Sequence, residues 1–438
     1  MQLTILGGGG FRVPLIYRAL TEARGMATPT RVVLYDVDRH RLDVIEQVCA
    51  QIGATIPSPP VVHSTTDLDE ALRGADVVFN AIRVGGTAGR VVDERVAIAA
   101  GLLGQETVGA GGLAYALRTL PVTDVIAARI AALAPHAWTI NFTNPAGIIT
   151  AAMRTHLGRR VFGICDTPLA LVRRVARLLQ VPAEQAVPDY QGINHLGFLT
   201  GFYHDGQDLL PGLLADPERL GHLEEARIFG TEAIQLSGAI PNEYLHYYTA
   251  APEEPHTTRG EFLAAQQAGF YQAGPTDDAY RRWQAVLDER ESTYMAEARE
   301  EERRSADVAD GGYHQVAVDL MTALRTGRPA RMILGVGNEA TIPALAPEAV
   351  VEVLCTVDDD GAHPIAPRTV LRHEPAALMS AVADAEATLV EAVRTRSRSL
   401  AVRAFASHPL VDGRTSADRL VEAYITAHPQ IAEVLTGL

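Results

Sequence analysis

Five short segments of the 438-residue chain carry side chains that could bind or transform a small ligand, and four of them also contain glycine. They supply guanidinium, carboxylate and amide groups with one thiol and one imidazole, which suit anion binding, proton transfer and metal ligation. Each segment alone has a simpler reading, because an Asn–Pro turn, a buried Cys or a core His needs no ligand. The segments are RVGGTAGR (83–90), GQETVGAGG (104–112), NFTNP (141–145), GICDTP (163–168) and GINHLG (192–197).

A run of glycines near the amino terminus indicates a phosphate-binding turn. Gly7 and Gly9 match the first two glycines of the GxGxxG fingerprint, whereas Arg12 stands at the third. Asp36 ends the next apolar run, where its carboxylate could accept hydrogen bonds from ribose hydroxyls and repel a 2′-phosphate. These features favour NAD over NADP, with a structural turn and a solvent-exposed Asp as the alternative. The predicted cofactor-binding residues are Gly7, Gly8, Gly9, Gly10, Phe11 and Asp36.

Alternating strand and helix patterns must position these residues. The predicted strands are 2–6, 31–35, 76–82, 139–141 and 161–165, and the predicted helices are 11–24, 39–52 and 276–304. Such alternation predicts an α/β fold with a Rossmann-like doubly wound parallel sheet, whose ligands bind at the carboxyl ends of the strands. The strand signal thins beyond about residue 170. We therefore expect an NAD-binding domain over 1–168 and a mostly helical α+β domain over 169–438 for substrate, metal and oligomerisation.

Composition limits the classes of partner. The formal net charge of −15 argues against nucleic acid or an anionic membrane as the main partner. Every basic residue except histidine is arginine, which excludes mechanisms that need a Schiff-base lysine or a P-loop lysine. The three cysteines are widely spaced, and no signal peptide or long apolar run is evident. We expect a cytoplasmic enzyme that acts on a small molecule.

Taken together, the motifs resemble glycoside hydrolase family 4. The resemblance rests on GGGG, IRVGG, GQETVGAGG, NFTNPAGIIT, GICDTP, GINHLGF and IPNEYLHYY, and extends to HPLVDGRTSADRLVEAY near the carboxyl terminus. It implies a glycosidase that depends on NAD and a divalent metal, commonly Mn²⁺. This family departs from the two-carboxylate pattern of most glycosidases. The implied route is transient oxidation at the sugar C3, deprotonation at C2, loss of the aglycone and addition of water.

The resemblance also implies roles for individual residues. Cys165 and His195 match the metal ligands, and this pair leaves further coordination positions for substrate oxygens and water. Tyr244 matches the base at C2, Glu106 matches the carboxylate that raises the basicity of that tyrosine, and Asp166 matches the leaving-group acid. A thiolate does not select Mn²⁺ by affinity, so geometry and supply would have to do so.

The implied substrate is a 6-phosphoglycoside. Arg90 and Asn144 match substrate contacts and Arg259 matches a further arginine, whose planar guanidinium suits phosphate. The likeness of GGGGFRVP and NEYLHYY favours a 6-phospho-β-glucosidase, whereas Asp166 in CDTP resembles the CDMP motif of α-specific members. A 2-hydroxy-acid dehydrogenase and a non-catalytic NAD-binding protein stay open as alternatives. The resemblance suggests a homodimer or homotetramer and leaves the anomer, sugar configuration, aglycone and metal undecided.

Overall fold

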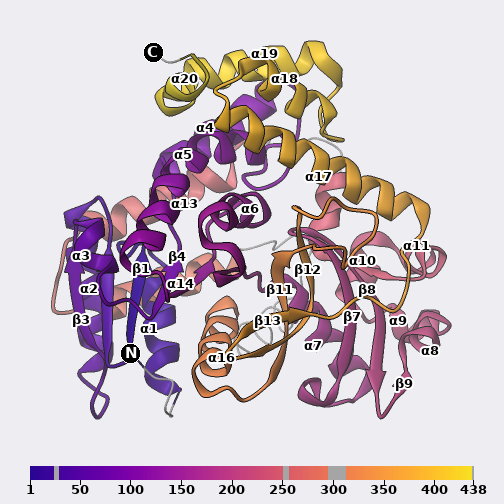
Figure 1. Cartoon of the computed structure of the whole chain (residues 1–438), viewed down its shortest axis with the longest axis horizontal. Helices are drawn as coiled ribbons and strands as arrows, with labels where there is room; N and C mark the ends of the chain where they lie inside the picture. Colours follow the sequence, from indigo (N-terminus) through magenta and orange to yellow (C-terminus); the bar gives the residue numbers. More distant parts are fainter. Residues whose placement is uncertain (24–28, 250–255, 294–311, 437–438) are drawn as a thin grey trace.

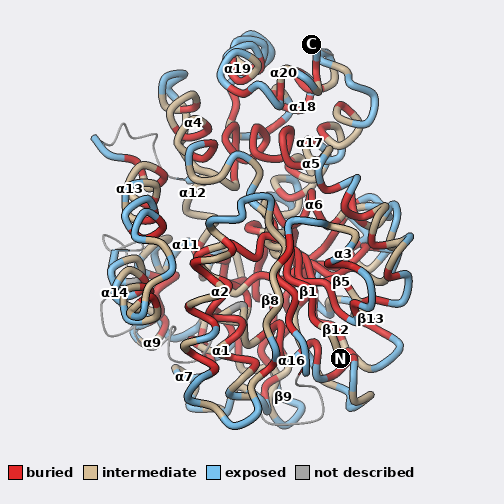
Figure 2. The backbone as a smooth tube through the Cα atoms, turned by 90° about the vertical axis from the view of Figure 1, so that its left-hand side faces the viewer, coloured by how far each residue is buried: buried red, intermediate tan, exposed pale blue. Residues whose placement is uncertain are grey.

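The structure is a computed structural model that describes residues 1–23, 29–249, 256–293 and 312–436. Its centre is one mixed sheet of 13 strands within these residues (Figure 1). Figure 2 shows that the buried residues concentrate along this sheet and on the helix faces that cover it. The described helices include none that is long and apolar enough to cross a membrane.

The amino-terminal half builds the parallel part of the sheet. Its strands are paired in the order β3-β2-β1-β4-β5-β6, which is the order of the dinucleotide-binding fold. The strands are β1 (Gln2–Leu6), β2 (Arg31–Tyr35), β3 (Val61–Thr65), β4 (Val77–Asn80), β5 (Trp138–Asn141) and β6 (Val161–Gly163). The chain order reverses between β1 and β4, so a crevice for a ligand opens beyond their carboxyl ends. The predicted Rossmann-like fold is confirmed.

Helices join these strands and close both faces of the sheet (Figure 1). Pro14 falls in the first turn of α1, where its missing N–H costs nothing, and the Asp38 side chain caps α2 by accepting from Arg41 N. The helices are α1 (Val13–Glu22), α2 (Arg39–Gly53), α3 (Leu68–Leu72), α4 (Gly86–Ala99), α5 (Gly109–Leu133), α6 (Ala146–Leu157) and α7 (Thr167–Leu179). The crossovers place the loops after each strand at one edge of the sheet.

The carboxyl-terminal half extends the same sheet with antiparallel strands. Strand β11 pairs with β6 through Gly335 and Gly163, so the two halves share one sheet. The added strands are β7 (Val187–Ile193), β8 (Leu196–His204), β9 (Gln207–Asp208), β10 (Ile240–Pro241), β11 (Ala330–Gly337), β12 (Val350–Asp358) and β13 (Gly361–Pro364). The α+β character of this half is as expected, while its division from the first half at residue 168 stays a prediction.

Helices of the carboxyl-terminal half cover the amino-terminal half. Helix α14 packs on α2, α16 packs on α1, and α13 packs on α4. The longer ones are α13 (Arg259–Gln272), α14 (Ala279–Ser292), α16 (Tyr313–Thr326), α17 (His373–Arg394), α18 (Arg398–Ser407), α19 (Gly413–Ala427) and α20 (Pro429–Thr436). The short ones are α8 (Leu210–Leu214), α9 (Pro217–Leu220), α10 (Glu224–Phe229), α11 (Thr231–Ser237) and α12 (His246–Thr249). The end of the predicted helix 276–304 lies outside the described residues.

Candidate active site

A cavity of about 900 Å³ opens at the carboxyl ends of the parallel strands. Its wall runs from Asp36 after β2, past Cys165 after β6, to Tyr244 and Arg259 in the carboxyl-terminal half. Twelve of the fourteen residues singled out in the sequence line it, whereas Gly8 and Gly9 do not. The twelve are Gly7, Gly10, Phe11, Asp36, Arg90, Glu106, Asn144, Cys165, Asp166, His195, Tyr244 and Arg259.

The glycine loop has the shape that a dinucleotide needs. Gly7 has φ of +81°, and a Cβ there would lie 2.4 Å from Ala81 O. Gly8 and Gly9 turn toward β2 and α2 instead, where a Cβ would meet Leu34 and Arg41 at 2.7 and 2.8 Å. Asp36 Oδ2 accepts from Gly9 N at 3.0 Å, which fixes the acid beside the loop. Glycine is therefore required here by close packing, and Gly7 and Gly10 form the wall that a diphosphate would face.

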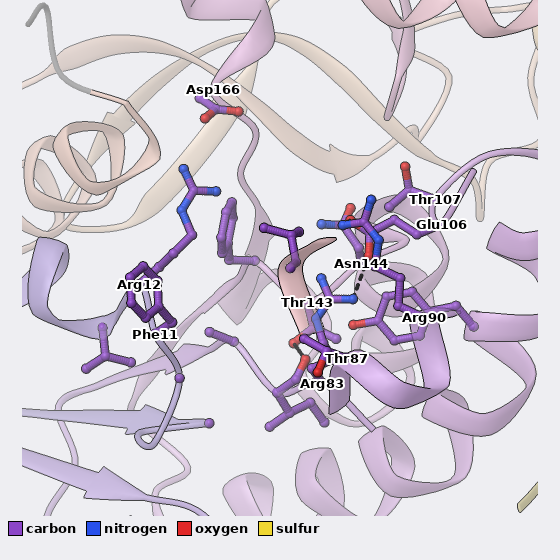
Figure 3. Close-up of a pocket in the computed structure, with 18 of the residues that line it drawn as sticks. Phe11, Arg12, Arg83, Thr87, Arg90, Glu106, Thr107, Thr143, Asn144 and Asp166 are labelled. Atoms are coloured by element: carbon purple, nitrogen blue, oxygen red, sulfur yellow. Dashed lines mark hydrogen bonds and ion pairs between the residues drawn. The ribbon is translucent and has the colours of Figure 1, made fainter. Parts of the chain in front are cut away.

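The opposite end of the cavity contains a compact cluster of charges (Figure 3). Glu106 accepts from Arg83 Nη1 at 2.6 Å and from Arg90 Nη1 at 2.7 Å. Burial disfavours the charged form of Glu106, but Arg83 and Arg90 outweigh it and hold the pKa at about 2. Glu106 is therefore ionised at neutral pH. Arg83 begins the segment 83–90 singled out in the sequence, but it was assigned no role because an arginine at a strand end has no local signature.

Glu94 connects this cluster to the helix that carries Arg259. Its side chain is almost fully buried and accepts from Arg90 Nε at 2.6 Å and from Gly260 N at 2.8 Å. A Cβ on Gly260 would lie 2.5 Å from Glu94 Oε2, so glycine allows this close approach. Arg259 Nη2 in turn donates to Arg290 O at 2.9 Å. Arg90, Arg259 and Arg290 thus gather at one end of the cavity.

Cys165, Tyr244 and His195 meet in the middle of the cavity. Cys165 Sγ lies 3.2 Å from Thr167 Oγ1, which accepts from Asn242 Nδ2 at 2.9 Å. Asn242 Oδ1 accepts from Tyr244 N, and the Tyr244 ring stacks on His195 with ring centroids 3.8 Å apart. Polar contacts join the segments of Cys165 and Tyr244, and the ring stack adds the segment of His195.

The donor atoms of Cys165 and His195 fit a metal site that is open to substrate. Burial lowers the pKa of His195 to about 3, against a weaker opposing effect of Glu106, so the imidazole is neutral as a ligand requires. Its Nδ1 atom is buried without a hydrogen-bond partner among the described residues. Burial, reinforced by Glu352 and Asp166, raises the pKa of the Cys165 thiol, so a metal would have to displace its proton. The described part of the chain offers no cluster of three His, Cys, Asp or Glu donors.

Hydrogen bonds of Asn194 fix the loop that carries His195, and the sequence did not predict these bonds. His195 has φ of +63°, an uncommon conformation for a residue other than glycine. Its neighbour Asn194 accepts from Ala146 N at 3.2 Å, directly after Asn144 and Pro145, and donates to Glu352 at 2.9 Å. Asn194 therefore links the predicted metal ligand to the predicted substrate contact. Only long-range packing brings β12 with Glu352 to this point.

Comparisons with known proteins match both halves of the chain. Residues 2–181 match the model of family 4 glycosyl hydrolase, and residues 190–411 match the model of its C-terminal domain. The chain is 27% identical to a 6-phospho-beta-glucosidase of Escherichia coli, with 100% of this chain and 98% of the relative covered. It is 30% identical to 6-phospho-alpha-glucosidase 1 of Lacticaseibacillus paracasei, with 83% of each covered.

A solved structure extends the likeness to three dimensions. It is a 6-phospho-alpha-glucosidase from gut microorganisms in complex with NAD and Mn²⁺, with a TM-score of 0.82 and 25% identity. The match covers 98% of each chain. The whole fold described above, including the antiparallel extension of the sheet, is therefore shared with a protein whose structure holds both groups.

Proposed function

Because the chain belongs to glycosyl hydrolase family 4, we propose that it hydrolyses 6-phospho-β-glucosides with the help of NAD and a divalent metal such as Mn²⁺. The family match spans both halves of the chain, which disfavours the 2-hydroxy-acid dehydrogenase considered from the sequence. The relatives that act on phosphorylated glucosides include enzymes named for either anomer. The β preference follows the likeness of the motifs GGGGFRVP and NEYLHYY.

The observation that carries this proposal is the charge of the cluster at the end of the cavity. Four arginines lie around two glutamates there, which leaves a net charge of about +2. A sugar phosphate carries a charge of about −1.5 to −2 at neutral pH. A phosphate would therefore balance this end of the cavity. The residues are Arg83, Arg90, Arg259, Arg290, Glu94 and Glu106.

The chemistry of the proposed reaction divides between the chain and its cofactors. NAD would supply a reversible hydride acceptor for the sugar C3, and the metal a Lewis acid for the sugar oxygens. Tyr244 would take the C2 proton on its phenol oxygen, and Asp166 would donate a proton to the departing glycosidic oxygen. Glu106 would act through the electrostatic effect of its charge. That charge already favours the protonated form of His195, whose ring stacks on Tyr244. Asn144 would bind the sugar from the cavity wall.

A panel of nitrophenyl glucosides tests the proposal. The α- and β-linked glucosides and galactosides, each with and without a 6-phosphate, are assayed with NAD⁺ and Mn²⁺. We expect release of nitrophenol from the 6-phospho-β-glucoside, loss of activity without NAD⁺, and no net accumulation of NADH. Faster cleavage of the α-linked phosphate would assign the α alternative instead. Equal rates with and without the phosphate would contradict the role of the arginine cluster.

Two further properties belong to this proposal. We place the enzyme in the cytoplasm, because Cys49, Cys165 and Cys355 are all unpaired. We also propose a homodimer or homotetramer, as the resemblance to the family suggests. Light scattering of the purified protein measures the assembly, and a monomer at micromolar concentration would contradict it.

A further inference from the structure

A fully buried arginine lies behind the arginine cluster of the cavity. Arg118, on α5, donates from Nη1 and Nη2 to the two carboxylate oxygens of Asp93 on α4, each at 2.6 Å. Asp93 thus compensates the charge of Arg118. The remaining donor, Nε, binds the backbone, where it donates to Val84 O at 3.0 Å. Arg118 therefore connects two helices and a loop from inside the protein.

The loop that Arg118 holds is the turn that leads from Arg83 into α4. Gly86 N donates to Arg83 O at 3.0 Å, which closes a β-turn, and Val84 O lies within this turn. The ring of Tyr115 has both guanidinium groups near it, that of Arg83 at 5.3 Å and that of Arg118 at 4.8 Å from its centroid. Arg118 thus supports the turn from behind, while the side chain of Arg83 lines the cavity.

Two glycines of segment 83–90 make room for this guanidinium. A Cβ on Gly85 would lie 3.1 Å from Arg118 Nε, and a Cβ on Gly89 would lie 3.2 Å from both Nε and Nη2 of Arg118. Gly89 belongs to α4 and directly precedes Arg90. The glycines between the two arginines of this segment are therefore matched to the side chain of Arg118.

The carboxyl-terminal motif completes the buried cluster. Helix α19 packs on α4 and α20 packs on α5 (Figure 1). Tyr424, the last residue of HPLVDGRTSADRLVEAY, donates from its hydroxyl to Asp93 O at 3.0 Å, and His428 Nε2 lies 2.9 Å from Asp93 Oδ1. Asp93, Arg118, Tyr424 and His428 are all buried. A buried polar network with its partners in place is rigid, so this one can fix α4 against α5.

We propose that Arg118 is a positioning residue for the phosphate-binding end of the cavity. It holds the turn of Arg83 and the helix of Arg90 at a fixed spacing, so that both guanidinium groups can contact one phosphate. This inference rests on the proposed function, because it concerns the same site for the phosphorylated sugar. The hydrogen bonds of a guanidinium fork are directional, so a small displacement of either arginine weakens them.

Gly89→Ala tests the inference without removing a charge. The three atoms nearest to the added Cβ all belong to Arg118, so the guanidinium has to move. Titration calorimetry of the full-length protein with NAD⁺ and Mn²⁺ should show glucose 6-phosphate bound about 10-fold more weakly, since small misplacements of binding groups are costly. NAD⁺ affinity, measured separately, should change less than about twofold because the cofactor end is a distant site. Alanine favours a helix more than glycine does, so the melting temperature should not fall.

A double-mutant cycle with Arg118→Lys shows whether Gly89 acts through Arg118. Lysine keeps the charge beside Asp93 but lacks the planar fork that also reaches Val84 O. We expect this variant to bind glucose 6-phosphate at least as weakly as Gly89→Ala, and the double variant to bind it no more weakly than Arg118→Lys alone. KM for the 6-phosphoglucoside should rise in step while kcat stays the same, as for a lost binding contact. Losses that add in the double variant would overturn the inference.

Gly269→Ala is the matched control, because Gly269 is exposed in α13 and a Cβ there meets nothing within 4 Å. It should leave both affinities unchanged. If Arg118→Lys does not fold, Gly89→Ala decides against this control. Unchanged affinity for glucose 6-phosphate in folded Gly89→Ala would make Arg118 a purely structural residue, and equal losses of glucose 6-phosphate and NAD⁺ would indicate a general distortion. Either result overturns the inference, whereas a wild-type protein that binds no glucose 6-phosphate contradicts the proposed function itself.

Discussion

The two ends of the cavity are built in different ways. The cofactor end is made mainly from one strand–turn–helix unit with Asp36 beside it, and backbone packing fixes its shape, as the 2.4 Å approach of a Cβ on Gly7 to Ala81 O illustrates. The substrate end joins Arg83, Glu106 and Arg90 with Glu94 and the amide of Gly260, and the bonded pair Glu94–Gly260 is 166 residues apart in the sequence. Its shape depends on buried charges that compensate one another.

This difference predicts different responses to mutation. A polar substitution at the cofactor end removes one contact from a loop that the backbone still holds. At the substrate end, removal of one charge leaves its partners buried and uncompensated, which costs more than a single hydrogen bond. A substitution at the catalytic centre, between the two ends, should lower turnover and leave the stability of the fold unchanged.

The largest effect is expected at the catalytic centre, for Tyr244→Phe. The ring that stacks on His195 remains and the proton acceptor is removed, so kcat should fall by about 10²–10⁴-fold while the melting temperature stays the same. Exchange of deuterium from C2 of the substrate into solvent should stop as well. Tyr247→Phe, at the neighbouring ring 5.6 Å from Tyr244, is the control and should retain activity. A Tyr244→Phe enzyme with normal exchange would place the base elsewhere.

The next effect is expected at the substrate end, for Glu106→Gln. The amide keeps the shape but leaves Arg83 without a counter-charge and Arg90 with Glu94 alone, and we expect a loss of about 3 kcal/mol in the free energy of unfolding. Denaturant unfolding at neutral pH measures this loss. Glu339→Gln, at an exposed ion pair with Arg154, should cost less than about 1 kcal/mol. Similar losses at the two sites would remove the contrast between buried and exposed charge.

Comparison of Glu106→Gln with the wild type also predicts how the free energy of unfolding changes with pH. The pKa of Glu106 is about 2 in the folded protein, below the usual 4.5, so the folded state favours the carboxylate. Its contribution to stability is fully present above about pH 4.5 and is lost as the pH falls toward 2. The difference in stability between wild type and Glu106→Gln should therefore narrow below pH 4.5. A constant difference from pH 7 to pH 3 would contradict this linkage.

The contrast between the two ends also explains what the sequence could predict. The glycine loop and Asp36 follow each other within 30 residues, so local periodicity and turn chemistry were sufficient to place them. Strand β3 was missed because its residues are only partly buried, and its alternation is weak. At the substrate end, family resemblance supplied Arg90 and Glu106, but no local pattern could reveal that Arg83 shares Glu106 or that Glu94 holds Gly260. Arg83 and Glu106 meet across the two ends of α4, and Glu94 and Gly260 meet through packing of α13 on α4.

A smaller effect is expected at the cofactor end, for Asp36→Asn. The amide oxygen can still accept from Gly9 N, so the loop should persist, but the charge that repels a 2′-phosphate is removed. We expect the preference for NAD⁺ over NADP⁺ to fall by about 10-fold, with little change in stability. Titration calorimetry with both nucleotides measures the ratio. Asp43→Asn, on α2 and paired with the exposed Arg39, should leave it unchanged. An unaltered ratio in Asp36→Asn would argue against a ribose contact.

The smallest effect is expected for Thr258→Ala, at the start of α13. This helix packs on α4 and carries Arg259 of the substrate end. Thr258 caps α13 with a reciprocal bond to Glu261, and its loss should cost about 1 kcal/mol of stability. Because Arg259 and Gly260 begin this helix, fraying there should also raise KM for the phosphorylated substrate by a few-fold while kcat stays the same. Ser397→Ala removes the cap of α18, far from the cavity residues, and should cost similar stability with no change in KM. Equal KM values for the two variants would mean that the position of Arg259 does not depend on the start of α13, and that the buried contact between Glu94 and Gly260 holds the substrate end together by itself.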